Sequence, residues 1–148
     1  MNAGRIFYKV KELLVFNDGV EKVYLEAMEA IDNEDLKRFF KERSEERQKF
    51  SLDLKAEMDI IEEKSDQPAG LSSNFYEIWR NFRNLVAFKD ETGLLSEIYR
   101  LKLESVDMYN QLLMEPNLDL STCKLLEKQR DDIQSSIQAL TRELDLAY

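Results

Sequence analysis

Apolar residues recur at alternating steps of four and three along most of the chain, which is the spacing of one face of an α-helix. The pattern is most regular in a helix predicted over residues 5–31. Its inward-facing positions are Ile6, Val10, Leu13, Asn17, Val20, Tyr24, Ala27 and Ile31. Asn17 is the polar member of this series. Gly19 follows it and costs about 1 kcal/mol against alanine in a helix interior. We expect one continuous helix, with a packing neighbour that approaches closely at Gly19.

The same periodicity predicts four further helices, over residues 33–64, 74–89, 93–114 and 119–146. Residues 32–35, Asp-Asn-Glu-Asp, supply a cap residue followed by acids and so begin the second helix. The link is only a few residues long, so the first two helices should form an antiparallel hairpin. The longest segment rich in helix breakers is 64–73, which contains Pro68 and Gly70. It is too short to separate two domains. Residues 1–148 are therefore expected to form a single helical domain.

Four long helices with one short helix between the second and third long ones predict an all-α fold. A hairpin, a crossing segment and a second hairpin is the order of ferritin-like four-helix bundles. The short helix would then be the crossover, lying across the bundle and burying Phe75, Trp79 and Phe82. The competing arrangement is a plain five-helix bundle.

Polar residues interrupt the inward-facing positions near the middle of each long helix. Between Phe40 and Phe50 every position is polar or charged. Continuing the helical spacing through this gap places Arg43 and either Glu46 or Arg47 on the inward face. Antiparallel packing would bring such residues to one level. We predict a structural polar layer made of Asn17, Arg43, Glu46, Arg47, Ser105 and Gln129.

The polar layer has two interpretations. Buried arginines need acceptors, so Arg43 and Arg47 would pair with carboxylates that fix the helix register. The candidate partners are Glu21, Glu97, Glu104 and Asp132. The weaker alternative is a metal site made of carboxylates alone, from Glu21, Glu46, Glu97, Glu104 and Asp132. We expect no metal, no cofactor and no catalytic residue, because the chain has no histidine and arginines lie on the same face.

Composition and charge narrow the classes of function. The chain has 148 residues and a net charge of −9, which disfavours binding to nucleic acid or anionic membranes. A single cysteine, Cys123, without any histidine makes no nucleophile–base pair. No run of 18 apolar residues is present, so we expect no membrane span. Charged residues interrupt the apolar part of the first 16 residues, unlike a signal peptide, and a cytoplasmic location is expected.

The chain resembles a bacterial four-helix-bundle family of unknown function in the ferritin-like superfamily. The resemblance covers nearly the whole chain and rests on residues of the first two helices, the short helix and the last helix. They are Asn17-Asp18-Gly19, Tyr24, Ala27, Leu36-Lys37, Phe40, Arg47, Phe50, Trp79, Leu126, Gln129 and Ile133. It implies a fold and little about function. The di-iron members of the superfamily carry a Glu-x-x-His motif on each of two helices. The sequence departs from this motif, because Lys49 stands three residues after Glu46 and Ile137 stands three residues after Gln134.

The expected function is that of a non-catalytic bundle that acts through self-association or through a protein partner not identifiable from sequence. A homodimer is expected because Phe7, Phe16, Tyr99 and Leu103 lie off the inward face. Two alternatives remain open. One is the carboxylate-ligated metal protein, and the other is a binder of small molecules or lipids between the aromatic short helix and the bundle.

Overall fold

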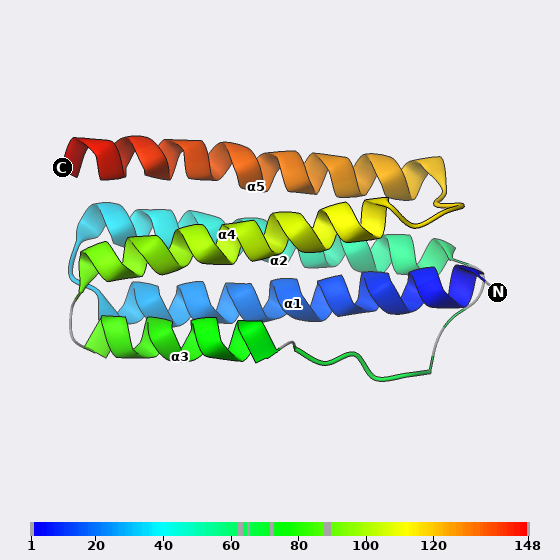
Figure 1. The fold of residues 1–148 in the computed structure, drawn as a ribbon, viewed down its shortest axis with the longest axis horizontal. Helices are drawn as coiled ribbons and strands as arrows, with labels where there is room; N and C mark the ends of the chain where they lie inside the picture. Colours follow the sequence, from blue (N-terminus) through cyan, green and yellow to red (C-terminus); the bar gives the residue numbers. More distant parts are fainter. Residues whose placement is uncertain (1, 62–63, 65, 72, 88–89, 148) are drawn as a thin grey trace.

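In the computed structural model the helices lie side by side along one long axis (Figure 1). The structure describes residues 2–61, 64, 66–71, 73–87 and 90–147, with side chains for 4–61, 64, 66–71, 75–87, 90 and 92–136. Within these ranges all regular structure is α-helical. The helices are α1 (Asn2–Ala30), α2 (Glu34–Ile60), α3 (Ser73–Ala87), α4 (Glu91–Leu113) and α5 (Leu120–Ala147).

The helix boundaries follow from local chemistry. Asn33 caps α2, since its side-chain oxygen accepts hydrogen bonds from the backbone N–H groups of Asp35 and Leu36 at 3.0 and 3.1 Å. The main difference from the predicted boundaries is the end of α2, which was expected near residue 64. Ile61 already has extended backbone angles, φ −72° and ψ 122°, and its side chain is buried. The helix thus ends without a glycine, and the backbone N–H of Ile61 still donates to the carbonyl of Met58.

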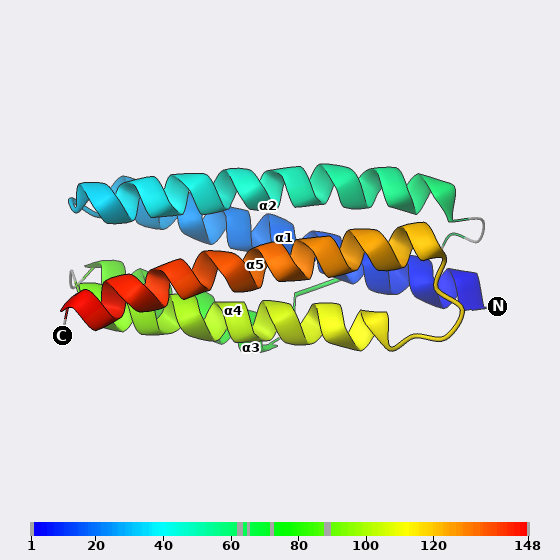
Figure 2. The same cartoon turned by 90° about the horizontal axis from the view of Figure 1, so that it is seen from above.

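The helix directions set the arrangement of the bundle. α1 and α2 form an antiparallel hairpin, whereas α2 and α4 run in the same direction and α5 returns antiparallel to α4 (Figure 1). The chain travels back along the bundle between the end of α2 and the start of α3, and the two termini lie at opposite ends (Figures 1 and 2). Each long helix therefore brings its central residues to the middle of the bundle.

The short helix α3 does not lie across the bundle, so this part of the sequence prediction was wrong. It runs lengthwise beside α1 and packs against α1 and α4 (Figure 1). Phe75, Ile78 and Phe82 are buried, as a three-and-four spacing requires. Trp79, which was expected to be substantially buried, is half-buried and donates its indole N–H to a Glu26 oxygen at 3.0 Å.

Gly19 in α1 is explained by this placement of α3. The α1 helix continues through Gly19 without a break. A Cβ atom at Gly19 would lie 2.7 Å from the Cζ atom of the Phe75 ring, closer than real Cβ atoms approach other heavy atoms. The absent side chain makes room for an aromatic ring, and the burial of that ring offsets the cost of glycine in a helix.

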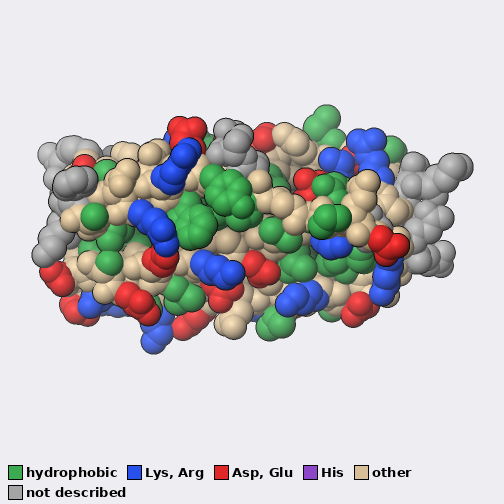
Figure 3. All heavy atoms as spheres, turned by 90° about the horizontal axis from the view of Figure 1, so that it is seen from below, with side chains coloured by type: hydrophobic (Ala, Val, Ile, Leu, Met, Phe, Trp, Pro, Cys, Tyr) green, Lys and Arg blue, Asp and Glu red, His purple; other side chains and the backbone are tan. Residues whose placement is uncertain are grey.

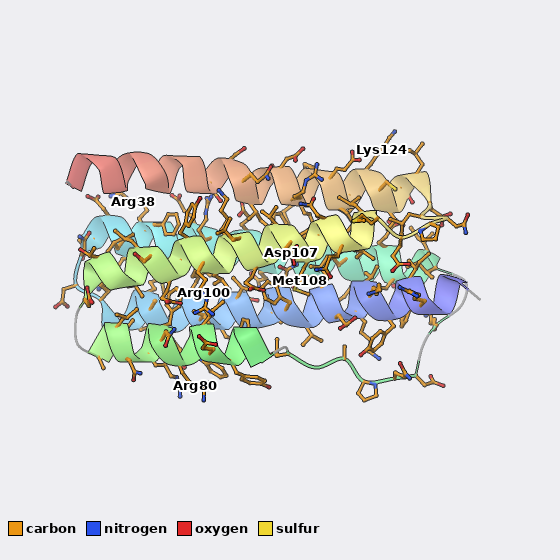
Figure 4. All side chains as sticks on the ribbon, in the orientation of Figure 1. Arg38, Arg80, Arg100, Asp107, Met108 and Lys124 are labelled. Carbon is orange, nitrogen blue, oxygen red and sulfur yellow. The ribbon has the colours of Figure 1, made fainter. Side chains whose placement is uncertain are left out.

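The apolar core is divided into two clusters along the bundle axis. The aromatic-rich cluster contains Phe16, Val20, Val23, Tyr24, Ala27, Ile31, Leu36, Phe40, Phe75, Ile78, Phe82, Leu94, Ile98 and Leu101. The other, which we call the aliphatic cluster, contains Ile6, Phe7, Val10, Leu13, Leu14, Phe50, Leu54, Ile61, Tyr109, Leu112, Leu126 and Ile133. Met108, near the middle of the bundle in Figure 4, packs against both. Phe7 and Phe16 were expected to be exposed, and their burial is a correction.

Among the residues placed in the structure, no helix is both long enough and apolar enough to cross a membrane.

Candidate functional site: a buried polar layer

The polar layer lies between the two apolar clusters and is centred on Arg47. Arg47 lies seven residues after Phe40 and three before Phe50 on α2, and both phenylalanines face the core. Helical spacing therefore turns Arg47 inward as well. Its side chain is 3% exposed. Nη1 donates to Asn17 Oδ1 at 2.7 Å and Nη2 donates to Ser105 Oγ at 3.0 Å. One guanidinium therefore joins α1, α2 and α4.

Tyr109 extends the network to α5. Its hydroxyl accepts a hydrogen bond from Asn17 Nδ2 at 3.0 Å and donates to Gln129 Oε1 at 2.5 Å. Gln129 Nε2 in turn donates to the backbone carbonyl of Phe50 at 3.3 Å. Asn17, Ser105, Tyr109 and Gln129 are all fully or almost fully buried. A chain of hydrogen bonds thus crosses the bundle and involves all four long helices.

Neutral groups hold the buried guanidinium. The sequence had led us to expect a carboxylate beside Arg47. In the described part of the chain, no carboxylate forms an ion pair with it, and its acceptors are the amide oxygen of Asn17 and the hydroxyl of Ser105. Ser105 Oγ also donates to the carbonyl of Leu101 at 2.8 Å, which orients its lone pairs. Dipoles aligned in this way replace part of the water that a buried cation loses.

Arg43 lies one turn before Arg47 and at the rim of the layer. Its guanidinium lies 3.8 Å from carboxylate oxygens of both Glu42 and Glu46, and it sits over the ring of Phe39. The side chains of Arg43 and Glu46 are about one fifth exposed, at 22% and 21%. Burial raises the pKa of Glu46, an effect that the neighbouring guanidinium of Arg43 opposes. Ion pairing is thus found at the rim and not in the buried centre.

The four remaining carboxylates of the sequence analysis surround the bundle and do not converge. Glu97 accepts from Asn81 Nδ2 at 3.4 Å and lies 3.9 Å from Arg100 Nη1. Burial, followed by the nearby Asp18 charge, raises the pKa of Glu21. Glu104 and Asp132 are half-buried. In the described ranges no group of three or more histidine, cysteine, aspartate or glutamate side chains could hold a metal ion.

Burial dominates the ionisation of Tyr109. Burial raises the pKa of Tyr109 to about 12, although the Arg47 guanidinium and the hydrogen bond from Asn17 favour the phenolate. The hydroxyl therefore stays protonated at neutral pH and donates to Gln129. The buried centre of the layer, from Arg47 through Asn17 and Tyr109 to Gln129, is therefore joined by hydrogen bonds between its own side chains.

The chain matches a known protein family. Residues 6–115, most of the chain, match the family described as Domain of unknown function (DUF2383). The chain belongs to this family. The matched range of this DUF2383 protein includes Asn17, Arg47, Ser105 and Tyr109, whereas Gln129 and α5 lie beyond it. No match was found among curated proteins or among solved structures.

Sequence reasoning missed several buried polar residues of the DUF2383 chain, among them Tyr109 and Glu57. Tyr109 lies four residues after Ser105, but the predicted inward series continued with a step of three to Met108. Glu57 is buried near the end of α2 and accepts from Ser121 Oγ at 2.8 Å and from Thr122 Oγ1 at 2.6 Å. Two features of the sequence could have revealed Glu57. It lies three residues after the inward-facing Leu54, and the start of α5 offers two hydroxyl groups, Ser121 and Thr122, as donors.

Two hollows lie along the seam between α1 and α3, on the face where Figure 3 shows hydrophobic side chains among charged ones. The larger has a volume of about 330 Å³ and is lined by Val23, Glu26, Ala27, Ala30, Phe82, Arg83, Val86 and Ala87. Between the hollows, Arg83 Nη2 and the Trp79 indole both donate to the carboxylate of Glu26, at 2.9 and 3.0 Å. Glu26, Trp79 and Arg83 of this seam are therefore already paired with one another.

Proposed function

We propose that this protein is a non-catalytic helical bundle of the ferritin-like type that acts by binding protein, either a second copy or a different partner. The observation that carries the proposal is the closed hydrogen-bond network centred on Arg47. In the di-iron members of the ferritin-like superfamily, inward-facing carboxylates and histidines at this level hold metal. Here a cation and neutral side chains fill that level.

The network supports a structural role because it specifies how the helices align. One helical turn is about 5.4 Å long, so a slip of α2 by one turn would carry Arg47 out of reach of Asn17 and Ser105. Such a slip would leave the guanidinium and its acceptors buried without partners. Each buried polar group left unsatisfied costs about 1–3 kcal/mol. The polar layer thus selects one register of a bundle whose apolar faces alone would tolerate several.

The metal-binding alternative rests on Glu21, Glu46, Glu97, Glu104 and Asp132. The buried cation of Arg47 disfavours it electrostatically, because a divalent ion at the same level would face like charge. The carboxylates also lie around the layer instead of facing one point. We therefore keep the structural role as the proposal and the metal site as the outcome that would replace it.

The self-association part of the proposal rests on α4. Tyr99 and Leu103 are four residues apart on this helix and are 42% and 51% exposed. Large apolar side chains that share one helix face favour an interface between copies. Sedimentation at high micromolar concentration is expected to show a dimer that a Leu103→Glu substitution dissociates. A 17.5 kDa monomer at every concentration would contradict this part.

The test of the polar layer compares two arginines on the same helix. Replacing Arg47 with alanine leaves Asn17 and Ser105 without their donor and is expected to cost about 2–4 kcal/mol of unfolding free energy. Replacing Arg43 with alanine should cost less than about 1 kcal/mol, because its ion pairs are long and partly exposed. Urea unfolding of both variants measures the difference.

Elemental analysis of protein purified without chelator completes the test. The proposal expects no stoichiometric metal and little change in the melting temperature on adding iron or manganese. Near-stoichiometric metal together with thermal stabilisation would overturn it. Equal costs for the two arginine substitutions would instead show that burial at Arg47 has no special role.

A further inference from the structure

A second groove runs along the bundle, between α2 and α5. α5 begins close to the end of α2 and moves away from it towards its own C-terminus (Figure 2). The resulting groove has a volume of about 430 Å³. It is lined by Glu42, Glu45, Glu46, Lys49, Phe50, Asp53, Leu125, Lys128, Gln129 and Asp132. No described helix covers it.

The charges along this groove are not balanced. Five carboxylates and two ammonium groups line it, in a protein whose net charge is −9. Among the described side chains, Glu45, Asp53 and Asp132 form no ion pair, and the two lysines form none either. Burial raises the pKa of Glu46, and the Asp132 charge adds to this in the same direction. A cationic partner would relieve this repulsion within the groove.

The shape of the acidic rim fits an extended cation better than a single ion. The carboxylates of α2 begin at Glu42 and continue to Asp53, which at 1.5 Å per residue spans about 16 Å. They do not converge on one point, and no described cluster could hold a metal. Between the acidic residues, the half-buried Leu125 and the edge of the almost fully buried Phe50 form the apolar part of the lining. Acidic rims over an apolar floor match a ligand that is basic on its edges and apolar on one face.

The chain itself shows how a helix fills a groove of this bundle. α3 lies over α1 and α4, with Phe75, Ile78 and Phe82 turned into the core. Arginine–carboxylate pairs join its edges to its neighbours. Arg83 pairs with Glu26 of α1 at 2.9 Å, and Arg100 of α4 pairs with Glu77 at 3.2 Å (Figure 4). The groove between α2 and α5 offers an apolar floor and unpaired acids to a helix from elsewhere.

We propose that the groove between α2 and α5 is the docking site for a basic amphipathic helix of a partner protein. The helix places apolar side chains against Phe50 and Leu125, and its lysines or arginines pair with Glu45, Asp53 and Asp132. This proposal rests on the proposed function, since it names the class of partner that the bundle binds.

The experiment measures binding of a synthetic leucine–lysine peptide of about 15 residues, with leucine on one helical face. Its affinity is compared for three proteins, namely the wild type, a groove variant and a control variant. The groove variant carries Glu45→Gln, Asp53→Asn and Asp132→Asn. The control carries Glu29→Gln, Asp66→Asn and Asp107→Asn, which lie outside the groove. Both variants lose the same charge, so general attraction between peptide and acidic protein affects them equally.

The groove variant is expected to raise the Kd about tenfold or more, whereas the control should change it less than about twofold. Amide chemical shifts should change along 42–53 and 125–132. Equal weakening by both variants would overturn the proposal, as would shift changes confined to the seam of α1 and α3. Spermidine binding is measured for the same three proteins. If spermidine binds as tightly as the peptide and is weakened only by the groove variant, the groove binds a linear polyamine and the helix proposal is overturned.

Failure of this proposal is distinct from failure of the proposed function. The peptide measurement depends on the groove rim, whereas the metal analysis and the Arg47 substitution depend on the buried layer. A chain with bound metal could still bind the peptide, and a metal-free chain could fail to bind it.

Discussion

The two long grooves of this bundle differ in what covers them and in how their charges are paired. The groove over α1 and α4 is filled by α3, whose aromatic residues join the core. Its rim charges are paired, and the hydrogen bond from Arg83 lowers the pKa of Glu26. The groove between α2 and α5 is open, and burial raises the pKa of Glu46 on its rim. Apolar burial and paired charge stabilise one side of the molecule. The other side keeps unpaired charge, which is available for recognition.

The largest loss of stability is expected from a substitution at the groove that α3 covers. Phe82 of α3 is almost fully buried and contacts Tyr24 of α1, with ring centroids 6.5 Å apart. Replacing Phe82 with alanine should cost about 3–5 kcal/mol, as large aromatic truncations in cores do. Replacing Tyr76, which lies on the same helix and is 47% exposed, should cost less than about 1 kcal/mol. Denaturant unfolding compares the two, and a small cost at Phe82 would mean that α3 contributes little to the core.

The second test concerns Tyr109, which belongs to the network between the grooves. Because its folded pKa of about 12 lies above its ordinary value of 10, the folded protein keeps this proton while the unfolded chain loses it. The stabilising effect is complete below about pH 10 and is lost as the pH rises to about 12, a loss of about 3 kcal/mol.

Urea unfolding at about pH 10 and about pH 12 measures this loss. Tyr109→Phe removes the titrating group, so the variant should lose less stability over that interval than the wild type. At neutral pH the variant should be less stable, because Asn17 and Gln129 lose a partner. Tyr76→Phe is the matched control on an exposed tyrosine. The same alkaline loss in wild type and Tyr109→Phe would assign it to other groups.

The smallest effect is expected at the open groove. A folded pKa above the ordinary value of 4.5 means that Glu46 contributes stability below about pH 4.5 and that this contribution is lost as the pH rises through the folded pKa. Glu46→Gln should therefore stabilise the protein at neutral pH by about 0.5 kcal/mol, a modest gain because the side chain is partly exposed and pairs with Arg43. The gain should vanish near pH 4. Thermal unfolding, with the exposed Glu45→Gln as control, detects it, and a loss of stability would mean that the pair with Arg43 outweighs burial.

Helical periodicity predicted the inward face of α1 fully, since all eight positions of its series are buried. It failed for Phe7 and Phe16 because α1 is contacted by α2, α3 and α4, so more than one stripe of the helix is covered. Phe16 meets Phe75 of α3 with ring centroids 5.5 Å apart. Periodicity says which face of a helix is apolar, but not how many neighbours cover it or along which direction a short helix packs.

The sequence indicated which residues form the polar layer better than it indicated their hydrogen-bond partners. Asn17, Arg47, Ser105 and Gln129 follow from breaks in the apolar series. Arg43 was predicted to face inward, with Glu46 and Arg47 left as alternatives, whereas the structure places Arg43 at the rim and Arg47 at the buried centre. The rotation of α2 decides this, and a gap without apolar residues does not define that rotation. The charge of the acceptors was expected to be negative because a buried cation is costly. Neutral amide and hydroxyl groups meet that need here, and only three-dimensional alignment brings them to the same guanidinium. The last predicted inward residues of α5, Ile137, Leu140 and Leu144, lie outside the described side chains.

The division of the core into two clusters has a consequence for how the protein folds. We expect Arg47 to keep its water until both α1 and α4 are in place, because its acceptors Asn17 and Ser105 lie on these two helices, far from it in sequence. The α1–α2 hairpin can form earlier, with the guanidinium still hydrated. Since apolar contact across the layer passes through Met108, each cluster can open while the other stays packed. Amide hydrogens in the two halves of α1 should then exchange with solvent as two separate groups.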